Sequence, residues 1–196
     1  MGHVLSSVLG RPVWRDIDAR WGRREITTRQ NASMQFALMQ ASQAQFDALI
    51  DAYHVDPMFA VLVADLRRRG ARVMVASDGF DYYIERMLAQ AGVRALPVVA
   101  NHLEWTHGRP ALNFPHEAAG DGHYGVNKAS PVRHEQALGR RVVYAGDGLS
   151  DTPAAGIADI LFAKGKLAAH CDVHGIGYLP FATMADVHAW VRSRRP

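Results

Sequence analysis

The chain is 196 residues long with a hydrophobic share of 48%, which suits one domain, or one domain with a small cap, around a real core. Its net charge of +3 fits a small anionic ligand, and it lacks the basic stripe interleaved with aromatic residues that indicates nucleic-acid binding. A lone cysteine, Cys171, rules out an internal disulfide, and no apolar run reaches the ~20 residues needed to span a bilayer, so we expect a cytoplasmic protein without a membrane partner.

The N-terminal part of the chain is predicted to be helical. A helix start is expected near Thr27-Thr28. Apolar residues recur at helical spacing in the stretches 13–21, 34–41 and 43–53. Because no strand separates these helices, we predict a small helical cap over residues 1–55.

From Asp56 onward, short apolar strands alternate with helices. Asp56-Pro57 predicts the start of a helix that ends at Gly70. The runs predicted as strands are 72–76, 96–100, 141–145 and 159–162, with a hairpin of 102–105 against 111–114 turned at His107-Gly108. The later helices are predicted over 80–91, 133–138, from 150, and over 184–191. This alternation is typical of an α/β fold with a parallel sheet covered by helices, which we assign to a core of residues 56–196.

A polar tripeptide, Ser77-Asp78-Gly79, follows the first predicted strand as a turn. Open α/β sheets bind ligands at the carboxyl ends of their strands. A hydroxyl with successive backbone N–H groups at a helix start can cradle a phosphate. Taken alone, this tripeptide is as well explained by a serine that caps the helix.

A second motif, Gly146-Asp147-Gly148-Leu149-Ser150-Asp151, follows another predicted strand. Two carboxylates spaced by four residues across a strand-to-helix turn can face one Mg²⁺, which prefers a few oxygen ligands and water. The alternative is a turn with an aspartate at the helix N-cap.

A third feature is Lys128, in a chain where lysine occurs only at positions 128, 164 and 166 and arginine supplies the other fixed positive charges. An ammonium beside a carboxylate and a phosphoryl group offsets charges that would repel. Considered by itself, Lys128 is better explained as a surface lysine.

Together the three motifs, in this order, resemble the haloacid dehalogenase superfamily of phosphatases over about residues 56–165. Helices before the second motif are where the subclass related to phosphoserine phosphatase carries its cap. The stretches VASDGFDYYIERML, FPHE and GVNKASPVRH look most like the methionine-salvage branch, which includes the phosphatase acting on 2-hydroxy-3-keto-5-methylthiopentenyl-1-phosphate.

The resemblance implies a role for each motif. Ser77 would hold a phosphate oxygen, with the amides of Asp78 and Gly79 beside it. Lys128 would bridge the nucleophile and the phosphate. Asp147 would ligate Mg²⁺, and Asp151 would ligate it or orient its water. In this family an aspartate attacks phosphorus, and water then hydrolyses the aspartyl-phosphate.

The sequence departs from the family in one respect: the first motif, Asp-x-Asp-Gly-Thr at the end of the central first strand of the sheet, is absent. The one Asp-x-Asp, Asp16-Ile17-Asp18, continues as Ala19-Arg20 in a helical pattern, and we interpret it as a solvated helix face. Without that strand, neighbouring strands lose a partner at about 1–3 kcal/mol per unsatisfied buried group. We therefore predict that the 196 residues alone are inactive and poorly folded, through a start codon set too late or a shortened chain.

Two other functions stay open. A phosphoserine phosphatase would use charges from the cap, for which Arg23, Arg24, Glu25 and Arg29 are available. A catalytically inactive relative would bind phosphate metabolites or a partner protein. Whichever function applies, the protein could be a monomer or a homodimer.

Histidines and apolar cap residues carry weaker signals. We expect His170 and His174 to be polar loop residues, because a second cysteine pair for a metal site is missing. Cys171 between them is expected to be a small, partly buried side chain. The apolar cap residues Met34, Phe36 and Met39 are expected in the core, or against an apolar substrate tail.

Overall fold

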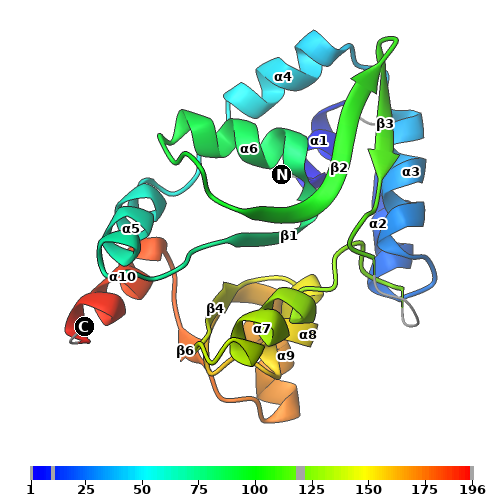
Figure 1. The fold of residues 1–196 in the computed structure, drawn as a ribbon. Coiled ribbons are helices and arrows are strands. Elements are labelled where there is room, and N and C mark those ends of the chain that lie inside the picture. Colours follow the sequence, from blue (N-terminus) through cyan, green and yellow to red (C-terminus); the bar gives the residue numbers. More distant parts are fainter. Residues whose placement is uncertain (1, 10–11, 118–121, 195–196) are drawn as a thin grey trace. The chain divides into compact units, whose positions relative to one another are not determined.

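The computed structural model describes residues 2–9, 12–117 and 122–194 (Figure 1). The chain divides into two compact units. The first unit comprises Met1–Val55 and Met74–Val126, and the second comprises Asp56–Val73 and Asn127–Pro196. Each unit has its own three-stranded sheet.

Helices make up most of the first unit, as its N-terminal sequence predicts. They are α1 (Gly2–Leu9), α2 (Trp14–Gly22), α3 (Thr28–Leu38), α4 (Gln43–Asp51) and α6 (Asp81–Gln90). Capping boxes fix two of the starts: Thr27 pairs with Gln30 before α3, and Ser42 pairs with Gln45 before α4. Each box satisfies amides that the first helical turn leaves without a partner.

The sheet of the first unit has the order β1-β2-β3. Strand β1 (Val75–Phe80) runs parallel to β2 (Val98–Thr106), and β3 (Arg109–Asn113) runs antiparallel to β2. Figure 1 shows β2 as one long curved strand that passes from β1 to β3. The stretches expected as separate strands at 96–100 and 102–105 are therefore continuous, because β2 finds a partner along its whole length.

The hairpin turn at His107-Gly108 is confirmed. Both residues have positive φ, 51° and 74°, which matches the twist of a tight two-residue hairpin. The first strand differs from its prediction, since it begins at Val75 and includes Ser77-Asp78-Gly79, which we expected as a turn. A register shift between Ala76 and Phe80 accommodates these residues inside the strand.

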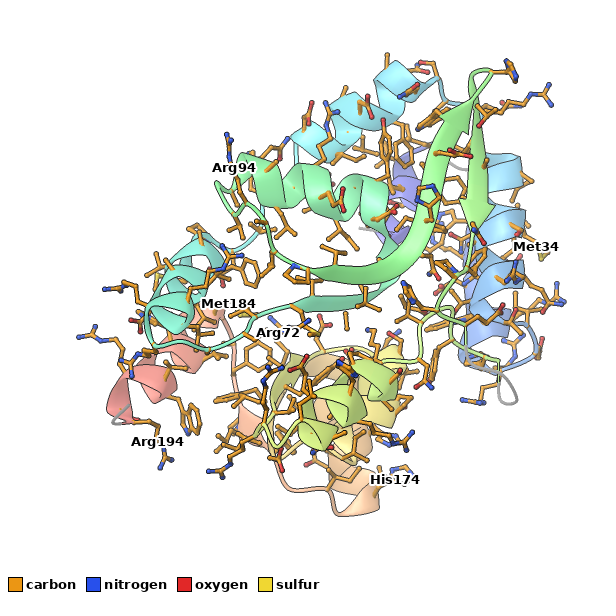
Figure 2. All side chains as sticks on the ribbon, in the orientation of Figure 1. Met34, Arg72, Arg94, His174, Met184 and Arg194 are labelled. Atoms are coloured by element: carbon orange, nitrogen blue, oxygen red, sulfur yellow. The ribbon has the colours of Figure 1, made fainter. Side chains whose placement is uncertain are left out.

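An aromatic core explains why residues 74–126 group with the first 55. Its buried members come from the N-terminal helices, β1, α6, β2 and the end of the hairpin; they are Leu5, Phe46, Ile50, Phe80, Tyr83, Leu103 and Phe114. Phe36 and Met39 pack against this core, whereas Met34, labelled in Figure 2, is 37% exposed. One boundary between the units coincides with the predicted cap boundary at residue 55, and the functional division into cap and core stays a prediction.

The second unit has a fully parallel sheet of order β4-β5-β6. Its elements are α5 (Pro57–Arg68), α7 (Ala129–Ala137), β4 (Val143–Gly146), the 3₁₀ turn η1 (Leu149–Asp151), α8 (Thr152–Ala155), β5 (Ile160–Ala163), α9 (Gly165–His174), β6 (Leu179–Pro180) and α10 (Met184–Ser193). The predicted start of α5 is confirmed, with Asp56 as its cap and Pro57 in its first turn.

Helix α9 and strand β6 were not predicted. His170 and His174 lie on α9 rather than in a loop, so that expectation is wrong. Their rings stack at 4.0 Å, and His174 is labelled in Figure 2. Cys171, on the same helix, is fully buried, as a small apolar side chain would be.

The parallel α/β architecture is thus confirmed. In the described ranges the strands form two separate sheets, and none of them pairs with both β1 and β4. No helix of the described residues is long and apolar enough to cross a membrane.

Candidate active site

Ser77 lies in the half-buried middle of β1. Its Oγ accepts a hydrogen bond from the Gly79 amide at 3.1 Å. A hydroxyl that accepts from its own strand still has its proton to donate. Ser77 is therefore oriented as a donor for an anionic oxygen.

Gly79 is required where it stands because Tyr83 occupies the space of a side chain. A Cβ at position 79 would lie 2.1 Å from the Tyr83 hydroxyl oxygen and 2.9 Å from its ring carbon. Tyr83 is 5% exposed, and burial raises the pKa of its phenol well above the ordinary value. The strand therefore lies against a buried ring at this position.

Gly79→Ala is expected to lower the free energy of unfolding by about 1–3 kcal/mol, as overpacking of a filled interior does. Urea unfolding followed by circular dichroism measures the change. The matched control is Gly22→Ala at the end of α2, where an added Cβ meets nothing within 4 Å. Equal stability of the two variants would contradict the argument.

Asp78 turns its side chain into the first unit. The carboxylate accepts from the Thr28 hydroxyl at 2.8 Å and from the Val126 amide at 2.9 Å, and its main-chain carbonyl accepts from Asn101 Nδ2 at 2.8 Å. These bonds fix Asp78 in place. The resemblance implies that its backbone amide would lie beside the phosphate.

Lys128 is a buried residue of the second unit, so its interpretation as a surface lysine is wrong. It is 6% exposed. Its Nζ donates to Asp151 Oδ1 at 2.6 Å and to Ser150 Oγ at 2.9 Å. A buried ammonium of this kind depends on its counter-ion.

Asp151 accepts from four groups. Its Oδ1 accepts hydrogen bonds from the Lys128 ammonium and, at 2.7 Å, from the Tyr144 hydroxyl. Its Oδ2 accepts from the backbone amides of Asp147 and Gly148 at 3.0 and 2.9 Å. Burial acts to raise the pKa of Asp151, but the charge and hydrogen bond of Lys128, with the Gly148 amide and Tyr144, hold it below its ordinary value. Asp151 is therefore ionised and held from all sides.

Gly146, at the end of β4, makes room for this carboxylate. A Cβ there would lie 2.7 Å from the carboxyl carbon and from Oδ2 of Asp151. The glycine therefore allows the end of β4 to approach Asp151 closely.

Tyr144 was missed by the sequence reasoning, since a tyrosine in an apolar strand is usually core. Burial and the neighbouring Asp151 charge raise the pKa of its phenol, which keeps it a donor. Tyr144→Phe is expected to cost about 1.5–3 kcal/mol in the free energy of unfolding, the range for a hydrogen bond to a charged group. Denaturant unfolding measures it. The exposed Tyr53→Phe serves as control and should change the value by less than about 0.5 kcal/mol.

Asp147 is the exposed carboxylate of the motif. Its main-chain carbonyl accepts from the Leu167 amide at the start of α9, at 3.1 Å, which fixes the loop. Its carboxylate has no hydrogen bond within the part of the chain that the structure describes, where no group of three metal-ligating side chains occurs either. A hard oxygen donor beside water fits Mg²⁺, which keeps several waters. Since all acceptor positions of Asp151 are used, the geometry favours Asp147 as ligand and Asp151 as the residue that orients.

Asp16-Ile17-Asp18 lies on helix α2 with Ile17 buried, not at a strand end. This agrees with its interpretation as a helix face. Thr28, whose hydroxyl bonds Asp78, was also missed, because nothing local distinguishes it from a capping threonine.

Comparisons with known proteins identify the family of the chain. The model of haloacid dehalogenase-like hydrolases matches residues 6–156, and the chain belongs to that family. The family predicted from the motifs is therefore confirmed.

Among curated proteins, the chain is similar to phosphatases that share one name. The chain is 25% identical over 182 residues to 2-hydroxy-3-keto-5-methylthiopentenyl-1-phosphate phosphatase of Brevibacillus brevis, which covers 90% of this chain and 81% of that protein. It is 23% identical over 187 residues to the protein of the same name from Exiguobacterium sp., which covers 92% and 85%.

Solved structures show the same fold. A phosphoserine phosphohydrolase-like protein from Francisella tularensis has a TM-score of 0.65 at 16% identity and covers 91% of this chain and 83% of its own. A probable phosphoserine phosphatase from Vibrio cholerae has a TM-score of 0.64 at 20% identity and covers 89% of this chain and 53% of its own. At such identities the likeness shows the fold alone.

Proposed function

We propose that this protein is a Mg²⁺-dependent phosphatase that hydrolyses a phosphomonoester of a small metabolite in the cytoplasm. The observation that carries the proposal is the buried Lys128–Asp151 pair beside the exposed carboxylate of Asp147. A buried ion pair costs desolvation and is weak evidence of stability, so its presence next to a free carboxylate supports a chemical role.

Lys128 supplies the positive charge. An ammonium has three N–H donors, of which Asp151 and Ser150 take two. The third has no acceptor among the described residues and is free for a phosphate oxygen or the nucleophile. Asp151 holds Lys128 in place, so the charge is positioned before the substrate arrives.

Ser77 donates its hydroxyl proton to a phosphate oxygen, with the Asp78 amide beside it. The Gly79 amide acts mainly by orienting Ser77, because it already donates to that hydroxyl. Asp147 would hold Mg²⁺, which supplies Lewis-acid neutralisation of the phosphoryl charge.

The nucleophile would be the aspartate of the family's first motif, Asp-x-Asp-Gly-Thr, which does not occur among these 196 residues. Its carboxylate oxygen forms the bond to phosphorus while the ester oxygen leaves with the bonding pair. Water then releases phosphate and restores the carboxylate.

The names of curated relatives support a substrate class. Two relatives that match 90% and 92% of this chain are named 2-hydroxy-3-keto-5-methylthiopentenyl-1-phosphate phosphatase, so we propose a methionine-salvage substrate. Phosphoserine is less well supported, because the cap charges are already paired: Arg23 with Glu25 at 2.6 Å and Arg29 with Glu117 at 2.6 Å.

The test is release of inorganic phosphate by protein expressed from the complete coding region, with Mg²⁺, from the methylthiopentenyl phosphate and from phosphoserine. We expect faster release from the first and none after chelation of the metal. If the protein binds phosphate but releases none from either compound, the result would favour the hypothesis of a catalytically inactive relative. If it neither binds nor releases phosphate, the proposal is refuted.

A further inference from the structure

A hydrogen-bond network in the first unit connects its helices to the residue next to Ser77. We call Trp21, Thr28, Asp78 and Val126 the Asp78 network. The Asp78 carboxylate accepts from Thr28 Oγ1 at 2.8 Å and from the Val126 amide at 2.9 Å. Thr28 Oγ1 in turn accepts from the Trp21 indole N–H at 2.9 Å. Helices α2 and α3 are thereby linked to β1 through side chains alone.

The chemistry of these groups fixes the direction of each bond. An indole N–H only donates, an ionised carboxylate only accepts, and a hydroxyl has one proton. Because Thr28 accepts from Trp21, its single proton goes to Asp78. The three residues form a one-way relay in which each bond polarises the next.

The network also holds the segment of residues 122–126. The Thr28 amide donates to the His123 carbonyl at 2.7 Å, and the His123 ring stacks on Trp21 at 5.5 Å and 17°. Thr28, His123 and Val126 are 8%, 7% and 0% exposed, so water cannot readily replace a lost bond. Val126 stands two positions before Lys128 in the sequence.

The backbone of Asp78 is fixed as well. Asn101, which is fully buried, donates Nδ2 to the Asp78 carbonyl at 2.8 Å. Asp78 is thus held by its carbonyl and by both oxygens of its carboxylate, and the neighbouring Ser77 is held with it.

We infer that Asp78 is a positioning residue for the Ser77 phosphate site. We also infer that phosphate binding at Ser77 strengthens the hydrogen bond from the Trp21 indole to Thr28, through the relay. The inference rests on the proposed function. A phosphate on Ser77 brings negative charge one residue from Asp78 and makes its carboxylate a stronger acceptor. Thr28 then donates more strongly and becomes a better acceptor for the Trp21 indole.

The experiment titrates the full chain with inorganic phosphate and follows the indole N–H resonances of its four tryptophans by NMR. Trp21→Phe identifies the Trp21 signal. We expect that signal to move downfield saturably. Thr28→Val and Asp78→Asn should abolish the movement and weaken phosphate binding ~10-fold, since a bond to a charged group is lost.

Two variants separate this role from general packing. Thr28→Ser keeps the hydroxyl and should restore both affinity and indole movement. Tyr82→Phe removes another hydroxyl-to-carboxylate bond of the first unit, to Asp47 at 2.7 Å, and should leave both unchanged.

The outcomes are distinct. If Ser77→Ala binds phosphate as well as the unmodified chain, the proposed function of Ser77 fails and the relay with it. If Ser77→Ala loses binding but Thr28→Val keeps both affinity and indole movement, only the relay is refuted. If Asp78→Asn does not fold, the comparison of Thr28→Val with Thr28→Ser tests the relay.

Discussion

Asp151→Asn is expected to lower the free energy of unfolding by about 3–5 kcal/mol, the cost of breaking a buried ion pair by removal of one partner. The side chains of Lys128 and Asp151 are each 7% exposed, and their atoms lie 2.6 Å apart. Asparagine keeps the shape but leaves the ammonium without a counter-charge. It also places an NH₂ donor where the carboxylate of Asp151 only accepts hydrogen bonds. Urea unfolding at neutral pH measures the loss.

Asp147→Asn is the matched control for stability. Asp147 belongs to the same motif, but its carboxylate is exposed and has no hydrogen bond within the described ranges. Its replacement should change the free energy of unfolding by less than about 0.5 kcal/mol. If the two variants are equally stable, Asp151 does not hold the loop.

The pair also predicts how stability depends on pH. Lys128 and the loop donors outweigh burial and hold the pKa of Asp151 below its ordinary value. Its contribution is therefore complete above the unfolded-state pKa of about 3.9 and is lost as pH falls through that value toward the lower folded-state pKa. Asp151→Asn should flatten this part of the acid limb, and an unchanged acid limb would contradict the assignment.

The rate of phosphate release by Asp147→Asn is expected to fall about 100-fold or more at fixed Mg²⁺. Even residues that only hydrogen-bond to metal ligands cost about 10–100-fold in metal affinity or activity when they are replaced. The fall should come without loss of stability, and added Mg²⁺ should recover part of it. The assay follows inorganic phosphate from the preferred phosphomonoester. Glu104→Gln removes an equally exposed carboxylate from β2 and should retain full activity. Undiminished release by Asp147→Asn would show that this carboxylate does not hold the metal.

The sequence predicts local structure well where a side chain fixes it. Asp56-Pro57 starts α5, Thr27 caps α3, and the hairpin turns at His107-Gly108, because caps and turns are decided within a few residues. The predicted end of the first strand was wrong, because β1 continues through Ser77-Asp78-Gly79 to Phe80, which pairs with Asn101.

The roles of Ser77, Lys128, Asp147 and Asp151 were expected from the order of their motifs and the resemblance to the family, and they stay predictions. Their contacts could not be predicted. The burial of Lys128 depends on a partner 23 positions away, and the Thr28–Asp78 bond joins residues 50 positions apart. Such distances along the chain carry no periodic signal, so sequence alone could not separate the two aspartates by role.

The loop of Asp147 and Gly148 has a consequence for the cost of binding. Both of its amides donate to Asp151, and its carbonyl is fixed by Leu167. A loop ordered before the ligand arrives loses little conformational entropy on binding, so more of the contact energy appears as affinity. The same rigidity limits the shapes that the loop can adopt around other ligands, which favours selection of one charged group over tolerance of many.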